Sequence, residues 1–370
     1  MKKILFMLGC AAAVLASCVK SEVIDVADTR VIGFEPFVNK ATKVANQIQQ
    51  AGPKAIDNLY QFWVFGYDDS TLQFDGTDNL AKLYYSSTLQ GFTYDNHQIW
   101  KLNDTYNFAA YSDGNYALTG TKKDEDVDDK NDLKVEYSLG DESNDYSSYL
   151  VFEDYEVSEN DLLAAITRPF TPRQDSDITP VPFQFQHMLS CIQISIVNSS
   201  KDFYLRVANI ELTAGKTGDC TYSINKADPY TKTINWTDLK DGVYLFESKF
   251  PITNDDMANA EGFIAPGAQA NMICFVLPQS NKDLTANVSL QTYIKDNGKF
   301  ESTQTAVQTM TANFEIPDTI ISGHESWKPG YQYIYKAELS GTAHYIHFRV
   351  ESVDNWVKTE VSTASTAGSN

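Results

Sequence analysis

The feature that most limits the fold of this 370-residue chain is a long series of short, strand-like runs. Tyr, Phe, Thr, Val and Ile fill these runs, and clusters of Gly, Asn and Asp separate them. Many short strands with turn signals between them are typical of sandwiches and barrels, so the sequence predicts an all-β protein. Strands are expected at residues 31–37, 59–67, 80–83, 92–102, 105–111, 133–139, 149–152, 183–196, 203–212, 242–246, 271–277, 284–294, 311–316, 331–339 and 345–350.

The alternation of apolar residues in the second half changes phase twice. Odd-numbered positions are apolar from Phe183 to Cys191, and even-numbered positions are apolar from Ile192 onward. Because a shift of one residue swaps the two faces of a strand, we expect a β-bulge near Cys191 and another at residues 208–209. The unbroken apolar run 272–277 predicts a central strand that is buried on both faces. A helical pattern is convincing only in short pieces such as 158–166.

Residues 169–182 contain four prolines and little apolar periodicity, which predicts an extended Pro-rich linker. The length of the chain is enough for two ordinary domains. We therefore expect an N-terminal β domain at 31–168 and a C-terminal β domain at 183–357.

The N-terminus predicts export and lipidation. Two lysines are followed by an apolar run at 4–15, and Leu15-Ala16-Ser17-Cys18 resembles a lipobox. The run is shorter than the roughly 20 residues that span a bilayer, so a lipid on Cys18 would be the only anchor. Residues 1–17 are then the signal peptide, and 18–30 form a polar lipidated tether. The alternative is an ordinary signal peptide with an incidental cysteine.

The charge and the cysteines exclude several classes of protein. The formal net charge is −20, so the surface repels nucleic acid, which we exclude as a partner. Beyond Cys18 the mature chain keeps Cys191, Cys220 and Cys274. Their wide spacing fits neither a zinc site nor a dense disulfide framework. At most one disulfide can form among them, and we expect none.

Catalytic motifs are absent from the sequence. We find no nucleophile elbow, zinc-protease motif, phosphate loop or dinucleotide fingerprint, and therefore expect no cofactor, no metal and no enzyme activity. His187 lies on an apolar strand face, as expected for a core histidine. The acidic run 122–145 fails the spacing of a calcium loop, which makes a solvated loop the better interpretation. A hydrolase with two suitably spaced carboxylates stays open as an alternative.

Aromatic clusters at residues 60–63 and 331–335 have two interpretations. Aromatic residues that alternate with a period of two are usually core residues or cross-strand pairs. An exposed, coplanar set of the same rings would instead bind sugars by stacking.

Several segments, spread over almost the whole mature chain, resemble the fimbrillin family of lipoprotein pilus subunits from Gram-negative anaerobes. The segments that carry the resemblance are RVIGF at 30–34, DLLA at 161–164, FQFQHML at 183–189, WKPGYQY at 327–333 and VESVDNW at 350–356. The resemblance implies two transthyretin-like β-sandwich domains in tandem and no enzyme activity. It also implies that a lipidated precursor reaches the outer membrane, where a trypsin-like protease removes an N-terminal strand. A strand from another subunit then fills the apolar groove that is left, by β-strand addition.

Two places in the sequence fit this mode of assembly. Arg30 stands between the polar tether and the first apolar strand, where a trypsin-like protease would cut; the alternative is an ordinary charged residue at the start of a strand. At the other end, Val357, Thr359 and Val361 alternate with polar residues before the chain fades into small residues. We expect this segment, which is made of Val357 and the first residues of the tail at 358–370, to act as a donor strand.

Together these observations predict a fimbrial subunit that assembles by strand addition and mediates cell adhesion. Its expected partners are other fimbrial subunits, the outer membrane through the lipid on Cys18, and host or bacterial surface glycans or proteins. The alternative is a surface glycan-binding lipoprotein of a polysaccharide-uptake system. An exposed aromatic platform would favour the alternative, whereas an apolar groove capped by the N-terminal strand would favour the fimbrial subunit. Whether the subunit is a stalk, tip or anchor stays open.

Overall fold

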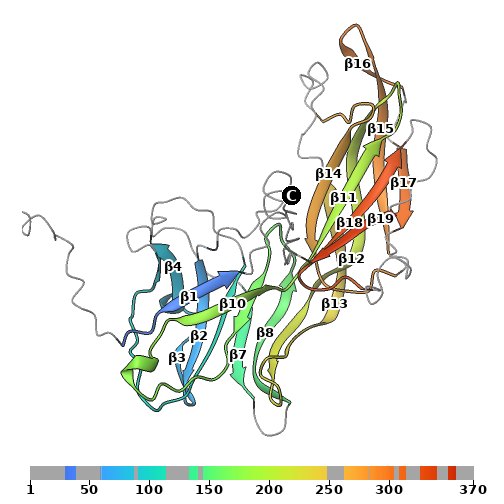
Figure 1. Cartoon of the computed structure of the whole chain (residues 1–370). Coiled ribbons are helices and arrows are strands. Elements are labelled where there is room, and N and C mark those ends of the chain that lie inside the picture. Colours follow the sequence, from blue (N-terminus) through green and yellow to red (C-terminus); the bar gives the residue numbers. More distant parts are fainter. Residues whose placement is uncertain are drawn as a thin grey trace, which may run out of the picture.

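The computed structural model confirms the all-β class (Figure 1). It describes residues 30–38, 59, 61–86, 91–113, 133–140, 145–247, 262–282, 284–303, 308–313, 326–339 and 349–355. In this part of the chain the strands form three sheets, and the helical pieces are two 3-10 turns, η1 (Asn79–Ala81) and η2 (Asp175–Asp177). No helix in these ranges is both long and apolar enough to cross a membrane.

Sheet I has eight strands in the order β1-β10-β9-β6-β2-β4-β5, with β3 paired to β2. Its strands are β1 (Phe34–Val38), β2 (Gln61–Asp68), β3 (Thr71–Phe74), β4 (Lys82–Ser86), β5 (Gly91–Thr93), β6 (Tyr106–Ser112), β9 (Leu163–Ile166) and β10 (Val181–His187). Both faces of its central strands are buried, because Trp63 and Phe65 pack into one apolar core while Phe62 and Val64 pack into another.

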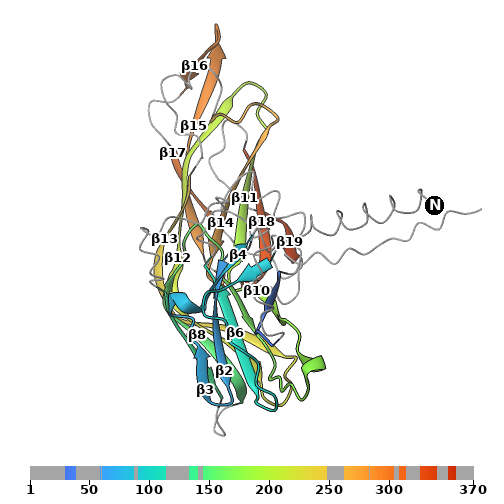
Figure 2. The same ribbon diagram turned by 90° about the vertical axis from the view of Figure 1, so that its left-hand side faces the viewer.

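Sheet II has seven strands in the order β16-β15-β12-β8-β7, with β13 paired to β12 and β17 paired to β15. Its strands are β7 (Lys134–Leu139), β8 (Tyr146–Glu156), β12 (Tyr204–Asn225), β13 (Lys232–Glu247), β15 (Thr285–Asp296), β16 (Lys299–Ser302) and β17 (Gln308–Asn313). The 22-residue strand β12 runs through both halves of the molecule, as Figures 1 and 2 show.

Sheet III has four strands in the order β14-β11-β18-β19. Its strands are β11 (Ser190–Asn198), β14 (Gln269–Val276), β18 (Tyr331–Leu339) and β19 (Arg349–Asn355). One continuous apolar core contains residues from all three sheets, such as Trp63 of sheet I, Leu150 of sheet II and Ile194 of sheet III. Sheet II therefore packs against sheet I at one end of the molecule and against sheet III at the other (Figure 1).

The strand pairing corrects the predicted position of the linker at 169–182. β9 and β10 flank this stretch and pair with each other in sheet I, and β10 already begins at Val181. In addition, β7 pairs with β8, and β8 pairs with β12. The expected halves 31–168 and 183–357 therefore share sheet II. Prolines are found both in linkers between domains and in irregular connections within a sheet. Here the connection joins two strands of one sheet.

Two further predictions about the second half differ from the structure. The phase change near Cys191 is not a bulge, because the chain leaves sheet I after β10 and enters sheet III at β11. The apolar run 272–277 lies in β14, which pairs only with β11 among the described strands and is an edge strand of sheet III. The expected irregularity at residues 208–209 is confirmed, since the register of β12 against β15 shifts between Val207 and Asn209.

The expected helix at 158–166 is also absent. Residues 163–166 form the strand β9, which pairs with β6 and β10 and has all four side chains buried. A short strand buried on both faces is apolar throughout, so periodicity cannot distinguish it from a buried helical turn.

A buried polar pair lies where the chain passes from sheet I to sheet III. Asp161 Oδ2 lies 2.5 Å from His187 Nδ1, and the Asp161 side chain is 2% exposed. Burial raises the pKa of Asp161, and the neighbouring His187 partly offsets this effect. Next to the pair, the Met188 N–H donates to the Leu162 carbonyl (2.9 Å), and the Trp236 indole donates to the Met188 carbonyl (2.9 Å). His187 is thus largely buried and pairs with Asp161 through Nδ1, as the sequence predicts for a histidine on an apolar strand face.

We predict that Asp161→Ala lowers the free energy of unfolding by about 3 kcal/mol, because it leaves His187 facing a buried site without its carboxylate. Urea denaturation measures the change, and Asp202→Ala, which removes an exposed carboxylate, is the control. In a double-mutant cycle, Asp161→Leu with His187→Leu should lose less stability than the sum of the two single variants. Additive losses would show that the two side chains are not coupled.

Candidate assembly site

The N-terminal strand lies in a seam between two parts of sheet I. On one side β1 pairs in parallel with β10, with Phe34 opposite Val181, and the Val181 N–H donates to the Gly33 carbonyl (2.8 Å). On the other side Val31 forms an antiparallel bridge with Ile99. Residues 30–38 therefore join β10 to the segment that follows β5, and we call this stretch the seam strand (Figure 1).

Further hydrogen bonds attach the seam strand to its second neighbour. The Ile32 N–H donates to the Gln98 carbonyl (2.9 Å), and the Trp100 N–H donates to the Arg30 carbonyl (2.8 Å). The buried Tyr94 hydroxyl donates to the Ile32 carbonyl (2.8 Å). The first part of the seam strand is thus hydrogen-bonded to residues 98–100 and its second part to β10, and β1 is the end strand of sheet I.

Two side chains of the seam strand fill an aromatic core. Ile32 is 1% exposed and Phe34 is 6% exposed, whereas the next residue, Glu35, is exposed to solvent. The ring of Phe34 is surrounded by four aromatic rings. These are Phe74 at 5.4 Å, Tyr94 at 5.8 Å, Phe108 at 5.6 Å and Phe183 at 5.6 Å between centroids. Burial of one such ring stabilises the fold by about 1.5–3 kcal/mol, and its edge-to-face contacts add to this.

The aromatic core filled by the seam strand is separate from the main core. Ile32 and Phe34 belong to a cluster made of residues from sheet I and its connections, while the continuous core that joins sheets I, II and III contains neither of them. If the seam strand left, the main core would keep its side chains, and the rings around Phe34 would line an apolar groove between β10 and residues 98–100. The sequence predicts Ile32 and Phe34 on one face of a strand, but the four surrounding rings come from strands far apart in the chain and carry no signal that groups them.

The sequence-predicted site residues fall at the margins of this site. Arg30, the first residue of the seam strand, is exposed and stands in a turn before β1, and its backbone carbonyl accepts the hydrogen bond from Trp100 given above. Cys18 and the donor residues Val357, Thr359 and Val361 lie outside the described residues. Cys191, Cys220 and Cys274 are free in this structure.

Four residues of the aromatic clusters that suggested sugar binding are core residues, while Tyr331 is half-buried and Tyr60 lies outside the described residues. Phe62, Trp63, Tyr333 and Tyr335 are all 1% exposed or less. They therefore form no sugar-stacking platform, and the observation that raised the glycan-uptake alternative is removed. Most of the acidic run 122–145, as well as His344 and His347, lies outside the described residues.

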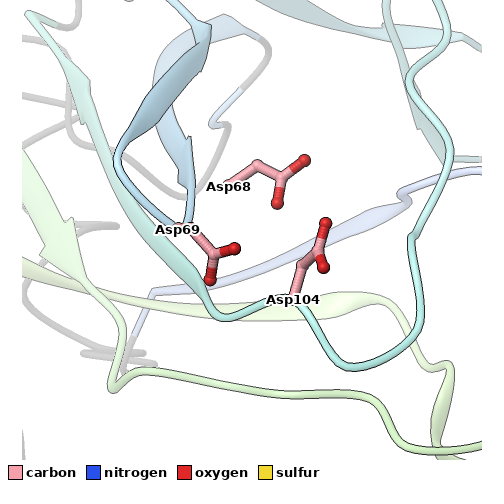
Figure 3. Close-up of side chains that lie close together, drawn as sticks. All are labelled: Asp68, Asp69 and Asp104. Atoms are coloured by element: carbon pink, nitrogen blue, oxygen red, sulfur yellow. The ribbon is translucent and has the colours of Figure 1, made fainter.

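Three carboxylates gather at the end of sheet I, where β2 turns into β3 (Figure 3). One oxygen from each of Asp68, Asp69 and Asp104 lies within 4.8 Å of the others. Oxygen ligands of this kind suit a hard cation such as Ca²⁺. In this structure, however, Lys101 forms an ion pair with the buried Asp68, and the Asp69 carboxylate accepts a hydrogen bond from the Thr105 N–H (2.9 Å). The cluster thus already has protein partners.

The model of the fimbrillin-like family matches residues 42–356. The chain belongs to the fimbrillin-like family. The match begins after β1, so the seam strand precedes the part of the chain that matches the fimbrillin-like model. A search of curated proteins found no match.

The fimbrillin-like chain is also similar to solved structures at low identity. A putative cell adhesion protein from Bacteroides uniformis has 14% identity and a TM-score of 0.45, with 89% of this chain and 100% of that chain covered. A fimbrial protein from Bacteroides vulgatus has 15% identity and a TM-score of 0.47, with 88% and 99% covered. A fimbrial assembly protein from Parabacteroides distasonis has 10% identity and a TM-score of 0.39, with 88% and 98% covered.

We predict that the effect of Asp104 on thermal stability depends on pH. Partial burial, a hydrogen bond with Asp68 and the charges of Asp68 and Asp69 raise the pKa of Asp104 above its ordinary value of 3.8. An acid whose pKa is raised by folding loses its proton less readily in the folded state than in the unfolded chain. Its ionisation therefore lowers the free energy of unfolding at neutral pH, and this effect disappears below the pKa of the unfolded state. Asp104→Asn should therefore raise the Tm at pH 7, and the difference from wild type should vanish as the pH falls toward 3.8.

Thermal unfolding of Asp104→Asn at several pH values measures this effect. Asp202→Asn, which removes an exposed carboxylate outside the cluster, should change the Tm little at any pH. A lower Tm for Asp104→Asn at pH 7 would contradict the prediction and show that attraction to Lys101 outweighs the repulsion.

Proposed function

We propose that this protein is a lipid-anchored subunit of a surface fimbria, which polymerises when a strand from a neighbouring subunit replaces the seam strand, and that the fimbria mediates adhesion. Membership of the fimbrillin-like family supports the fimbrial role. The observation that supports strand replacement is the seam strand itself, which pairs with residues 98–100 in its first part and with β10 in its second part, and which fills an aromatic core separate from the main one. The proposed role is structural and includes no catalysis.

Strand replacement requires the seam strand to leave, and the fold limits where a protease must cut. A cut after Arg30 separates the lipidated tether from the fold but leaves residues 31–38 in the seam. A cut between β1 and β2 releases the tether and the seam strand together. The first basic residues after β1 in the sequence are Lys40 and Lys43. We therefore propose that cleavage in residues 39–58 activates the subunit, and that cleavage at Arg30 alone releases a subunit whose groove is still filled.

The strand that enters the groove must present apolar side chains at every second position, because alternate residues of a strand face the same side. Val357, Thr359 and Val361 have this spacing, and they stand near the C-terminal end of the chain after the last described strand, β19. We propose that they replace Ile32 and Phe34 in the next subunit. The lipid on Cys18 would hold the precursor at the outer membrane until the cut is made.

The proposed function predicts that locking the seam strand in place prevents polymerisation. Val31 and Ile99 face each other in an antiparallel bridge, where Cα atoms are about 4.5–5.5 Å apart and within the range of a disulfide. In Val31→Cys with Ile99→Cys, the oxidised precursor should fold and be cut by trypsin but form no filaments. Reduction should restore polymerisation, as seen by electron microscopy and by ladders on gels. Val31→Cys alone is the matched control, and normal filaments from the oxidised double variant would contradict strand replacement.

A second prediction concerns the donor. Deletion of residues 357–370 should leave a folded subunit that no longer enters filaments, because all described strands end before residue 356. A truncated subunit should still accept the C-terminal strand of a wild-type partner and so cap a growing filament. If the truncated protein polymerises alone at the normal rate, the C-terminal segment is not the donor.

A further inference from the structure

Two cationic side chains lie over aromatic rings of the β12–β13 hairpin, which turns at one end of the molecule (Figure 1). Arg168 follows β9 in sheet I, and its guanidinium carbon lies 4.3 Å from the centre of the Tyr230 ring in the hairpin. Lys232 begins β13, and its ammonium lies 6.0 Å from the centre of the buried Tyr222 ring. Arg168 is exposed and stands two residues after the end of β9.

Neither cation has a carboxylate partner in the part of the chain that the structure describes. The ion pairs found there involve other basic residues, and none includes Arg168 or Lys232. Partial burial, and then the positive charge of Arg168, lower the pKa of Lys232.

Asp228, the acidic residue nearest to Lys232 in the sequence, is hydrogen-bonded within the hairpin turn. Asp228 Oδ1 accepts a hydrogen bond from the Tyr230 N–H (3.1 Å), and Oδ2 accepts one from the Thr231 hydroxyl (2.6 Å). These hydrogen bonds lower the pKa of Asp228 and fix the conformation of the hairpin. On the other side, Thr167 is fixed by backbone and side-chain hydrogen bonds to Phe108. Both cations therefore stand on rigid supports, which favours binding because little order must be gained.

We propose that Arg168, Lys232 and Tyr230 form a binding site for a carboxylate-bearing sugar, such as a uronic or a sialic acid residue of a surface glycan. The guanidinium can donate two parallel hydrogen bonds to a carboxylate, and the ammonium adds a second positive charge. The bound carboxylate would remove the repulsion between the two cations. Tyr230, which is 75% exposed, offers an aromatic surface beside them on which the body of the sugar can pack.

The exposed ring favours an acidic sugar over an acidic peptide. A glutamate or aspartate side chain needs only the two cations, and the ring would contribute little to its affinity. The surface elsewhere is strongly acidic, which disfavours a long acidic peptide but tolerates a glycan with isolated carboxylates. This site is independent of the assembly groove, so it can be tested on the monomeric chain, and its failure would leave the proposed fimbrial function untouched.

The test measures binding by the full-length purified lipoprotein in detergent, by isothermal titration calorimetry. The probes are trigalacturonic acid and its methyl ester, 3′-sialyllactose and lactose, and a hexaglutamate peptide. We expect at least one acidic sugar to bind about tenfold tighter than its neutral counterpart, with affinity that falls as salt is added. The uronic and sialic arms show which acid the site prefers.

Variants assign the binding to these residues. Arg168→Gln should lose about tenfold in affinity, Arg168→Lys should lose less because it keeps the charge, and Tyr230→Ala should weaken sugar binding. Arg206→Gln removes an arginine from another part of β12 and should bind like wild type. Equal binding of acidic and neutral sugars, hexaglutamate bound as tightly as the acidic sugars, or an Arg168→Gln variant that changes only the Tm would each overturn the proposal.

Discussion

The rest of the structure depends on the pairing of β12 along both of its edges. The first part of β12 pairs with β15 and its second part with β8, while β13 follows the opposite edge over most of the length. Because β8 precedes β12 in the chain and β15 follows it, this one strand joins both ends of the molecule into a single sheet. Register shifts at three places along β12 let it twist enough to pack against sheet I at one end and sheet III at the other.

The seam strand stands outside this arrangement. Its side chains fill the aromatic cluster inside sheet I and make no part of the core that β12 organises. Loss of the seam strand, as the proposed strand replacement requires, would therefore disturb this cluster and leave the side chains of the main core in place. A subunit that must exchange a strand needs this separation, because a donor strand can enter only a molecule that is still folded.

Charge is distributed unevenly over this acidic molecule. At the β2–β3 turn, Lys101 neutralises the most buried of three carboxylates, so the cluster is satisfied within the protein. At the β12–β13 hairpin the balance is reversed, because Arg168 and Lys232 have aromatic neighbours and no described carboxylate. An excess of positive charge on an otherwise negative surface attracts anionic ligands to one place and repels them elsewhere.

The sequence by itself determined the all-β class, the apolar strand face on which His187 lies and the irregularity at residues 208–209. These properties follow from local alternation and spacing, which are written in neighbouring residues. Only the tertiary structure decided which strands share a sheet: the prolines of 169–182 connect two strands of sheet I, and the phase change near Cys191 marks a passage between sheets. It also decided that 163–166 is a strand and that four distant rings surround Phe34. Strand partners and aromatic contacts join residues far apart in the chain, and no periodicity within a short window can record them.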